Sequence, residues 1–348
     1  MLPKMLTTLL ACALPAACAT ATAAGATTST AGKDAIAAST SDVLKGDSRA
    51  AVRALQSVAA GEFAGADAHY RACMLERFDR TQPPAPVLTA EDPFAARVLA
   101  IYQDYWWRAL ATPSQRDGFD ARLERDLRDV LDEHAQAASG IDAVEKALGA
   151  QLLARGYHAQ LDRTPPLREL MLWRKQETRE YRVALPEGPQ TVEVDLLDDF
   201  VSRGWSSYAR CGRGGAGGWA TDERLYAVVP SYAKDGGLES EAFRVVFLGH
   251  EAQHFADQNR YPGILPWELE YRAKLVELAQ AETVSAKRLR GFMTARGDDM
   301  DSPHTYANKR VVAALTQRLG RSPDQAPVAE LQAAARAELF ADSARRGE

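Results

Sequence analysis

Apolar residues recur at intervals of three and four through the first half of the chain, from about residue 42 onward. This spacing is typical of amphipathic helices, and Pro93 stands where a helix would begin. The predicted helices cover Ala51–Phe78, Pro93 through Trp106, Phe119–His134, and a segment from a cap at Ser139 to Leu153.

The pattern changes to alternation after Pro165-Pro166. Two β-branched runs, Glu180–Leu185 and Thr191–Leu196, flank a turn-forming stretch and predict a hairpin. A further strand is predicted at Leu225–Val229, and the proline that follows it fits an edge strand or a strand end better than the centre of a sheet. The glycine-rich segment 212–218 lacks the Lys-Ser/Thr of a phosphate loop, so we interpret it as a flexible loop.

Helical spacing returns beyond Glu239 and predicts helices over 269–289, 306–319 and 328–344. The fold class expected from these elements is α+β and mostly α. A helical N-terminal region, 42–164, should precede a domain over 165–348 with a small mixed or antiparallel sheet and long C-terminal helices.

The start of the chain is typical of an exported bacterial protein. Lys4 precedes a mostly apolar stretch that is too short to cross a membrane, so 1–19 is predicted to be a signal peptide. Residues 14–18 resemble a lipobox imperfectly, which leaves two alternatives: a lipid anchor at Cys18, or cleavage by ordinary signal peptidase. Residues 20–41 are predicted to be a flexible linker. We expect a periplasmic protein or an outer-membrane lipoprotein that meets the membrane only through its N-terminus.

Composition narrows the possible partners. The chain has 348 residues, 46% of them apolar, and a net charge of −5, so it can bury a large core but offers no broad cationic surface for nucleic acid. The aromatic residues between Tyr102 and Trp107 are interpreted as core rather than as a ligand groove. Cys73 and Cys211 are the two cysteines beyond the signal segment, and both a disulfide and two buried thiols remain open.

The strongest chemical signal is the motif from His250 to His254, His-Glu-x-x-His, which holds two of the six histidines. On a helix, residues four apart share a face, so both imidazoles could bind one tetrahedral ion, for which zinc is best suited. Glu251 would then be the general base that takes a proton from metal-activated water. Phe243, Val246 and Phe247 extend the histidine stripe backwards, so the helix should be buried. The competing interpretation is two core histidines bonded to the backbone.

Hydrolysis needs a third protein ligand and one open position. A loop at 261–266 should end the first helix and bring a second helix, beginning near Trp267, back against it. Its carboxylates Glu268, Glu270 and Glu277 are the candidates, and Glu268 and Glu270 would point in different directions.

The two segments resemble the gluzincin metallopeptidases, in which HExxH is followed on a second helix by a glutamate ligand, often within Glu-x-x-Ala-Asp. The resemblance covers under a fifth of the chain, and it implies that Glu270 is the third ligand. Lys274 stands where gluzincins commonly place an aspartate that orients the first histidine. Asp257 is the expected substitute for it, or else a surface carboxylate. The resemblance also implies an edge strand for substrate; Leu225–Val229 is the candidate, and a purely structural strand is the equal alternative.

The oxyanion of a peptidase needs a donor from a later segment, for which His304 and Tyr306 are candidates. The alternative is that His304 is a solvent-facing loop residue and that Tyr306 packs at the start of a helix. We therefore predict an exported zinc-dependent peptidase, with peptide or protein as substrate. The alternative is a non-catalytic zinc-containing envelope lipoprotein or binding protein on the same scaffold.

Overall fold

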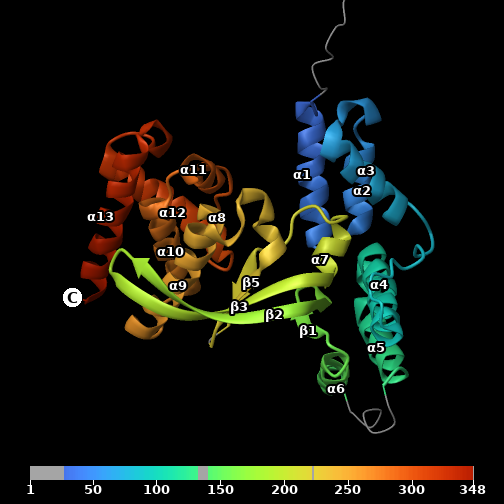
Figure 1. Ribbon diagram of the computed structural model, residues 1–348. Helices are drawn as coiled ribbons and strands as arrows, with labels where there is room; N and C mark the ends of the chain where they lie inside the picture. The colour runs from blue at the N-terminus through green and yellow to red at the C-terminus, as the bar shows by residue number, and fades with distance from the viewer. Residues whose placement is uncertain (1–26, 132–139, 222, 348) are drawn as a thin grey trace, which may run out of the picture.

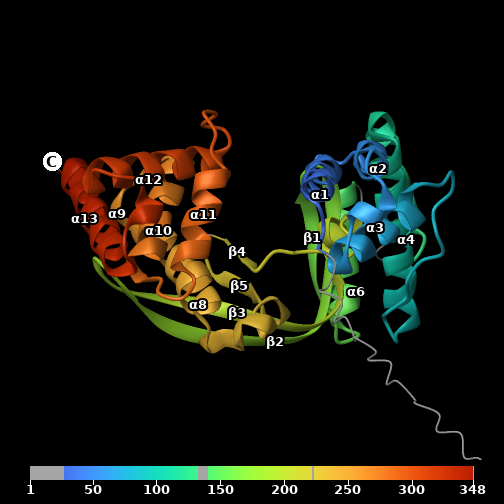
Figure 2. The same ribbon diagram turned by 90° about the horizontal axis from the view of Figure 1, so that it is seen from above.

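The computed structural model describes residues 27–131, 140–221 and 223–347. The predicted signal peptide, the start of the predicted linker, His134 and Ser139 lie outside them. The fold is α+β and mostly α, as predicted, with one five-stranded sheet (Figures 1 and 2). Among the described residues, no helix combines the length and the apolar character needed to cross a bilayer.

Helices make up most of the described residues up to residue 153. The predicted helix over 51–78 is interrupted by an irregular segment around a short 3-10 turn, because the chain reverses there to pack one half against the other. The helices are α1 Thr30–Leu44, α2 Ser48–Gln56, α3 Gly65–Phe78, α4 Pro93–Ala111, α5 Arg116–Arg128 and α6 Ile141–Leu153.

The predicted linker is wrong for residues 30–41, which form α1. Ser29 caps this helix by accepting a hydrogen bond from the Gly32 backbone N–H. A side chain at Gly32 would meet the carbonyl oxygen of Glu62 at 2.7 Å, and Ser39 is fully buried 3.1 Å from the Tyr70 hydroxyl. Small residues therefore allow close helix packing here. The linker prediction missed this because it took the lack of large apolar residues as a sign of an unfolded segment.

The aromatic residues of α4 are core, as interpreted from the sequence. Tyr102, Tyr105, Trp106 and Trp107 are each at most 4% exposed. Their polar atoms are also satisfied: the two indoles donate to backbone carbonyls, and the two hydroxyls donate to carboxylates of neighbouring helices. They leave no open surface for a ligand.

The sheet is mixed, with strand order β1-β2-β3-β5-β4. All neighbouring strands are antiparallel except β3 and β5, which are parallel. The predicted hairpin is confirmed, but it is much longer than predicted and turns at Pro186-Glu187. The strands are β1 His158–Thr164, β2 Leu167–Leu185, β3 Gly188–Arg203, β4 Gly218–Ala220 and β5 Leu225–Val228.

The edge strand beside the later helices is β4, not the predicted Leu225–Val229 segment. β5 lies between β3 and β4, so its edges are both paired. β4 begins at Gly218, within the glycine-rich segment interpreted as a loop. A side chain at Gly218 would come within 2.2 Å of the Tyr226 carbonyl oxygen, so the glycine permits the close pairing of the two strands.

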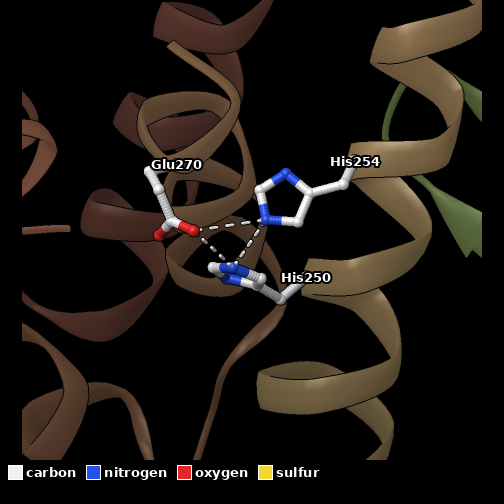
Figure 3. A group of neighbouring side chains, drawn as sticks. All are labelled: His250, His254 and Glu270. Atoms are coloured by element: carbon white, nitrogen blue, oxygen red, sulfur yellow. Dashed lines mark hydrogen bonds and ion pairs between the residues drawn. The ribbon is translucent and has the colours of Figure 1, made fainter. Parts of the chain in front are cut away.

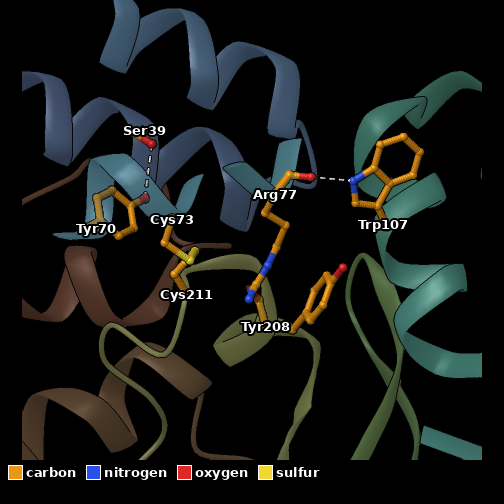
Figure 4. Close-up of a disulfide and its surroundings, with 7 residues drawn as sticks. All are labelled: Ser39, Tyr70, Cys73, Arg77, Trp107, Tyr208 and Cys211. Carbon is orange, nitrogen blue, oxygen red and sulfur yellow. Dashed lines mark hydrogen bonds between the residues drawn. A yellow bond between two sulfur atoms is a disulfide. The ribbon is translucent and has the colours of Figure 1, made fainter. Parts of the chain in front are cut away.

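Cys73 and Cys211 form a disulfide, which settles the alternative left open by the sequence (Figure 4). The bond joins α3 to the chain just after α7, Gly204–Ala209, which follows β3. Beside it the Arg77 guanidinium lies over the ring of Tyr208, 4.4 Å from its centroid. The chain therefore returns to the N-terminal helices after the hairpin.

Helix α9 packs on the face of the sheet formed by Val194, Leu196 and Ala227, and α10–α13 extend the same core behind it (Figure 2). The predicted helix over 269–289 is two helices, because the chain bends at 281–284, where the Glu241 carboxylate accepts three backbone N–H groups. The helices are α8 Glu241–Phe243, α9 His250–Arg260, α10 Pro266–Gln280, α11 Ser285–Thr294, α12 Pro303–Leu319 and α13 Val328–Gly347.

The two halves of the molecule have separate cores but share the β2–β3 hairpin (Figure 1). The beginning of β2, from Leu167 to Leu172, belongs to the N-terminal core, whereas Val183 and Leu185 belong to the C-terminal core. Residues 158–164, placed by prediction in the helical region, are β1. The predicted boundary near residue 165 therefore falls in the turn between two paired strands, β1 and β2, and not between separate domains.

Candidate metal centre

The HExxH motif begins α9, directly after a π-helical stretch, Arg244–Gly249. Phe243 and Phe247 are buried on the preceding turns and anchor the helix in the C-terminal core. The wide π turn brings Gly249 against α10, where its backbone lies close to Val276 and Gln280. The motif is thus held between the sheet and α10.

His250, His254 and Glu270 converge on one point (Figure 3). The Nε2 atoms of the two histidines are 3.0 Å apart, and Glu270 Oε1 lies 3.4 Å from His254 Nε2 and 3.6 Å from His250 Nε2. Both imidazoles come from α9 and the carboxylate from α10. Of the three candidate carboxylates, Glu270 is therefore the one that joins the histidines.

This triangle fits a tetrahedral zinc ion. Ligand atoms bound to zinc at about 2.0–2.1 Å lie about 3.3 Å from one another, close to the three separations observed. Within the described part of the chain these three residues form the whole donor group, so a fourth position is left for water or substrate. Two imidazole nitrogens that face each other at 3.0 Å also require a proton or a cation between them.

The electrostatics of the group are those of a cation site. Burial lowers the pKa of His250, but the Glu270 and Glu277 carboxylates, which accept hydrogen bonds from the ring, outweigh it and raise that pKa to about 9. Burial raises the pKa of Glu270, yet its contacts with His250, His254 and His304 hold it well below its ordinary value. The carboxylate is therefore ionised and favours positive charge at the point where the ligands meet.

Glu277 orients His250 from the side opposite the ligand triangle. Its Oε1 lies 2.7 Å from His250 Nδ1, and its other oxygen accepts from Arg288. Because Nδ1 donates to this carboxylate, Nε2 is the nitrogen that faces His254 and Glu270, and a metal ion bound there would replace its proton. Glu277 is thus not the third ligand but the acid that orients His250, a role for which the sequence offered Asp257 as one of two interpretations.

The prediction that Asp257 orients a histidine is wrong, and so is its alternative as a surface carboxylate. Asp257 is 1% exposed and accepts hydrogen bonds from Gln253 and Arg272. It lies one turn past His254, where α9 faces an earlier part of the antiparallel α10. The third candidate ligand, Glu268, caps the start of α10 by accepting from the Leu265 backbone N–H and is paired with Arg346.

The second oxygen of Glu270 is held by two other residues. Lys274 donates to Glu270 Oε2 from the next turn of α10, and His304 Nδ1 lies 2.7 Å from the same oxygen. His304 comes from the start of α12, so the structure brings this oxyanion candidate to the site but engages its Nδ1 with Glu270. Lys274, noted in the sequence only as a departure, contacts the site directly.

The other oxyanion candidate, Tyr306, lies in the packing between helices. Its ring packs against Trp267 with centroids 5.2 Å apart, and its hydroxyl accepts a hydrogen bond from Arg310. Tyr306 is 9% exposed. Its position supports packing of α12 on α10 rather than a role at the ligand triangle.

Glu251 is half-buried on the turn that also carries His250. Burial and the negative charge of Glu251 together raise the pKa of Tyr232 above its ordinary value. Tyr232 is 5% exposed and donates to the Gly217 carbonyl oxygen, beside β4. The general base predicted from the motif is therefore on α9, near enough to Tyr232 to influence its ionisation.

A cavity of about 220 Å³ opens beside His254 and Glu270. Phe255 and Leu269 give it an apolar side, and Thr221, which follows β4, lies on its rim. Its remaining lining residues are Ala220, Gln258, Pro266 and Pro303. Two ligands of the candidate site are therefore accessible from a pocket that is bordered by the sheet edge.

Comparison with known proteins adds nothing to this picture: no family model, no curated protein and no solved structure matches the chain. Inferences about function therefore depend on the site itself.

Proposed function

We propose that this chain is an exported zinc-dependent peptidase of the gluzincin type, with His250, His254 and Glu270 as metal ligands. The observation that carries the proposal is the convergence of two Nε2 atoms and Glu270 Oε1 within 3.0–3.6 Å of one another. Buried histidines and a carboxylate are costly without such a partner. The export signal predicted from the sequence supports a location in the bacterial envelope.

The site supports hydrolysis more than structural zinc binding. Structural zinc sites use four protein ligands, whereas catalytic sites use three and keep one position open. A zinc ion held here would polarise a substrate carbonyl and lower the pKa of a neighbouring water. Glu251 would accept the proton of that water and pass it to the leaving amine.

The surroundings of the site support peptide as the substrate. β4 is the edge strand on the side of the C-terminal helices, and its last residue, Ala220, lines the cavity beside His254. An extended peptide that pairs with this edge would run past the ligands, and a side chain could enter the cavity between Phe255 and Leu269. β4 takes the place of the Leu225–Val229 segment in this proposal.

The second candidate is a zinc protein without catalytic activity. One observation favours it: the cavity is lined by His254 and Glu270 but not by Glu251. In that case the pocket would bind a partner and Glu251 would have no chemical role.

Comparing the wild type with Glu251→Gln separates the two candidates. For the peptidase, the wild type should cleave labelled casein or a defined peptide pool, lose cleavage with a chelator and regain it with zinc. Glu251→Gln should keep one zinc per chain and lose about 10²–10⁴-fold of the rate. The matched control is Glu239→Gln, an exposed glutamate preceding the motif, which should leave the rate unchanged.

Cleavage by Glu251→Gln at the wild-type rate would contradict the proposed role of Glu251. A wild type that holds zinc but cleaves none of the substrates would favour the non-catalytic candidate.

A further inference from the structure

We propose that Lys274 is a positioning residue for the metal: it holds one oxygen of Glu270 so that only the other can act as a ligand. This inference rests on the proposed function, since it requires an ion at the site. Nothing in the resemblance to gluzincins anticipates it, because those enzymes commonly carry an acid at this position.

The two oxygens of Glu270 have different surroundings. Oε2 accepts from the Lys274 ammonium and lies 2.7 Å from His304 Nδ1. Oε1 faces the two histidine Nε2 atoms at 3.4 and 3.6 Å. With Oε2 already bonded on two sides, a metal ion meets Oε1 alone, and the carboxylate binds through one atom rather than two.

Lys274 is the fixed member of the pair that binds Oε2. It is 4% exposed, it lies one turn from Glu270 on the same helix, and its ammonium lies 5.7 Å from the centroid of the Phe292 ring. His304 is the mobile candidate, because its side chain is 72% exposed. A buried ammonium that left its carboxylate would lose its compensating charge, so Lys274 keeps Oε2 in place.

Fixing one oxygen of Glu270 limits this carboxylate to one coordination position on the metal ion. A carboxylate free to bind through both oxygens would occupy the position needed by water or substrate. Lys274 therefore keeps three protein ligand atoms at the site and preserves the open fourth position that hydrolysis requires.

The charge of Lys274 and its hydrogen bond have opposite effects on metal affinity. A positive charge close to the ligands repels a metal ion, whereas the hydrogen bond orients the ligand and strengthens binding. Two variants separate these effects. Lys274→Gln removes the charge but keeps a donor for Oε2, and Lys274→Met removes both.

The test measures zinc affinity by competition with a chromophoric chelator, together with the visible absorption spectrum of the Co²⁺ form. We expect Lys274→Met to bind zinc about 10-fold or more weakly than Lys274→Gln. We also expect its Co²⁺ bands to weaken towards those of a five-coordinate ion, while the bands of Lys274→Gln stay as in the wild type. Lys287→Met, at an exposed position on α11, should behave as the wild type.

Equal zinc affinities and equal Co²⁺ spectra of the Gln and Met variants would overturn the inference while leaving the proposed metal site intact. A wild type that binds no zinc would overturn both. If Lys274→Met does not fold, a crystal structure of the zinc-loaded wild type decides: Glu270 bound through Oε1 alone, with Oε2 against Lys274, supports the inference, and binding through both oxygens overturns it.

Discussion

Glu277 Oε1 lies 2.7 Å from His250 Nδ1, and this contact fixes which nitrogen of His250 faces the other ligands. Glu277 is fully buried, and although burial raises its pKa, contacts with His250 and Arg288 hold that pKa below its ordinary value. The contact therefore pairs an ionised carboxylate with the N–H of the ring. His254 differs: within the described residues its buried Nδ1 has no hydrogen-bond partner.

Replacing Glu277 with Gln should weaken zinc binding by about 10–100-fold, because the amide orients the ring less strongly and no longer raises the basicity of Nε2. Competition titration with a chelator measures the effect. Glu268→Gln, on the same helix but engaged in capping its start, serves as the control and should keep the wild-type affinity. Equal affinities of Glu277→Gln and the wild type would show that the contact has no role in metal binding.

Arg272 of α10 joins α9, α13 and the hairpin turn through a buried network of ion pairs next to the site. It is fully buried and bonds Asp257 of α9 and Asp342 of α13 at 2.9 Å each, as well as Glu187 in the turn of the hairpin. Arg272→Met leaves three acids without their shared cation, so we expect the free energy of unfolding to fall by about 3–5 kcal/mol.

Chemical denaturation followed by far-UV circular dichroism checks this expectation. Arg260 offers a matched control, because it also pairs with Glu187 at 3.3 Å but is half exposed. Arg260→Met should cost less than about 1 kcal/mol. Similar losses in the two variants would contradict the importance of the buried network.

The disulfide between Cys73 and Cys211 closes a loop across a sequence separation of 138 residues. Removing such a cross-link increases the entropy of the unfolded chain, and we expect Cys73→Ala to lose about 2–5 kcal/mol of stability. Thermal unfolding with and without a reductant provides the measurement. The reductant should lower the Tm of the wild type to that of Cys73→Ala and leave the variant unchanged. If the reductant leaves the wild-type Tm unchanged, the result would argue against the Cys73–Cys211 disulfide.

Glu169 should make the stability of the protein depend on pH. Burial raises the pKa of Glu169 to about 7, although it accepts hydrogen bonds from the backbone N–H groups of Leu170 and Trp205. A carboxyl whose pKa is raised in the folded state contributes stability that is complete below its unfolded pKa of about 4.5 and is lost as the pH rises through about 7.

The variant Glu169→Gln lacks this titration. Its Tm should lie close to that of the wild type at pH values near 5 and above it near pH 8. The corresponding difference in the free energy of unfolding near pH 8 is on the order of 1–3 kcal/mol. Parallel dependence of the two Tm values on pH would contradict the assignment.

The fold class and most helices could be predicted because their apolar spacing is regular, but α1 and β4 could not. α1 packs through small residues such as Ala35 and Ser39, whose burial does not register as hydrophobicity. β4 comprises three residues that begin with Gly218, and only its pairing with β5 defines it as a strand. Both elements depend on contacts with distant parts of the chain.

At the site, the histidine pair followed from helical periodicity alone, whereas the surrounding contacts depend on how α9 and α10 are aligned. When two helices run antiparallel, the end of one lies beside the start of the other. Glu277, late in α10, therefore contacts His250 at the start of α9, and Arg272, earlier in α10, contacts Asp257 further along α9. The spacing of seven residues between Glu270 and Glu277 places both on one face of α10, and this spacing was the signal in the sequence that Glu277 could contact the site. The approach of His304 from α12 had no local signal beyond its position at a helix start.

The most direct test of the account is a crystal structure of the zinc-loaded protein, with anomalous diffraction recorded at the zinc edge. The account predicts one strong peak about 2.0–2.2 Å from His250 Nε2, His254 Nε2 and Glu270 Oε1, with the fourth position open to the cavity. A peak elsewhere, a fourth protein ligand on the ion, or no peak between these residues at saturating zinc would contradict it.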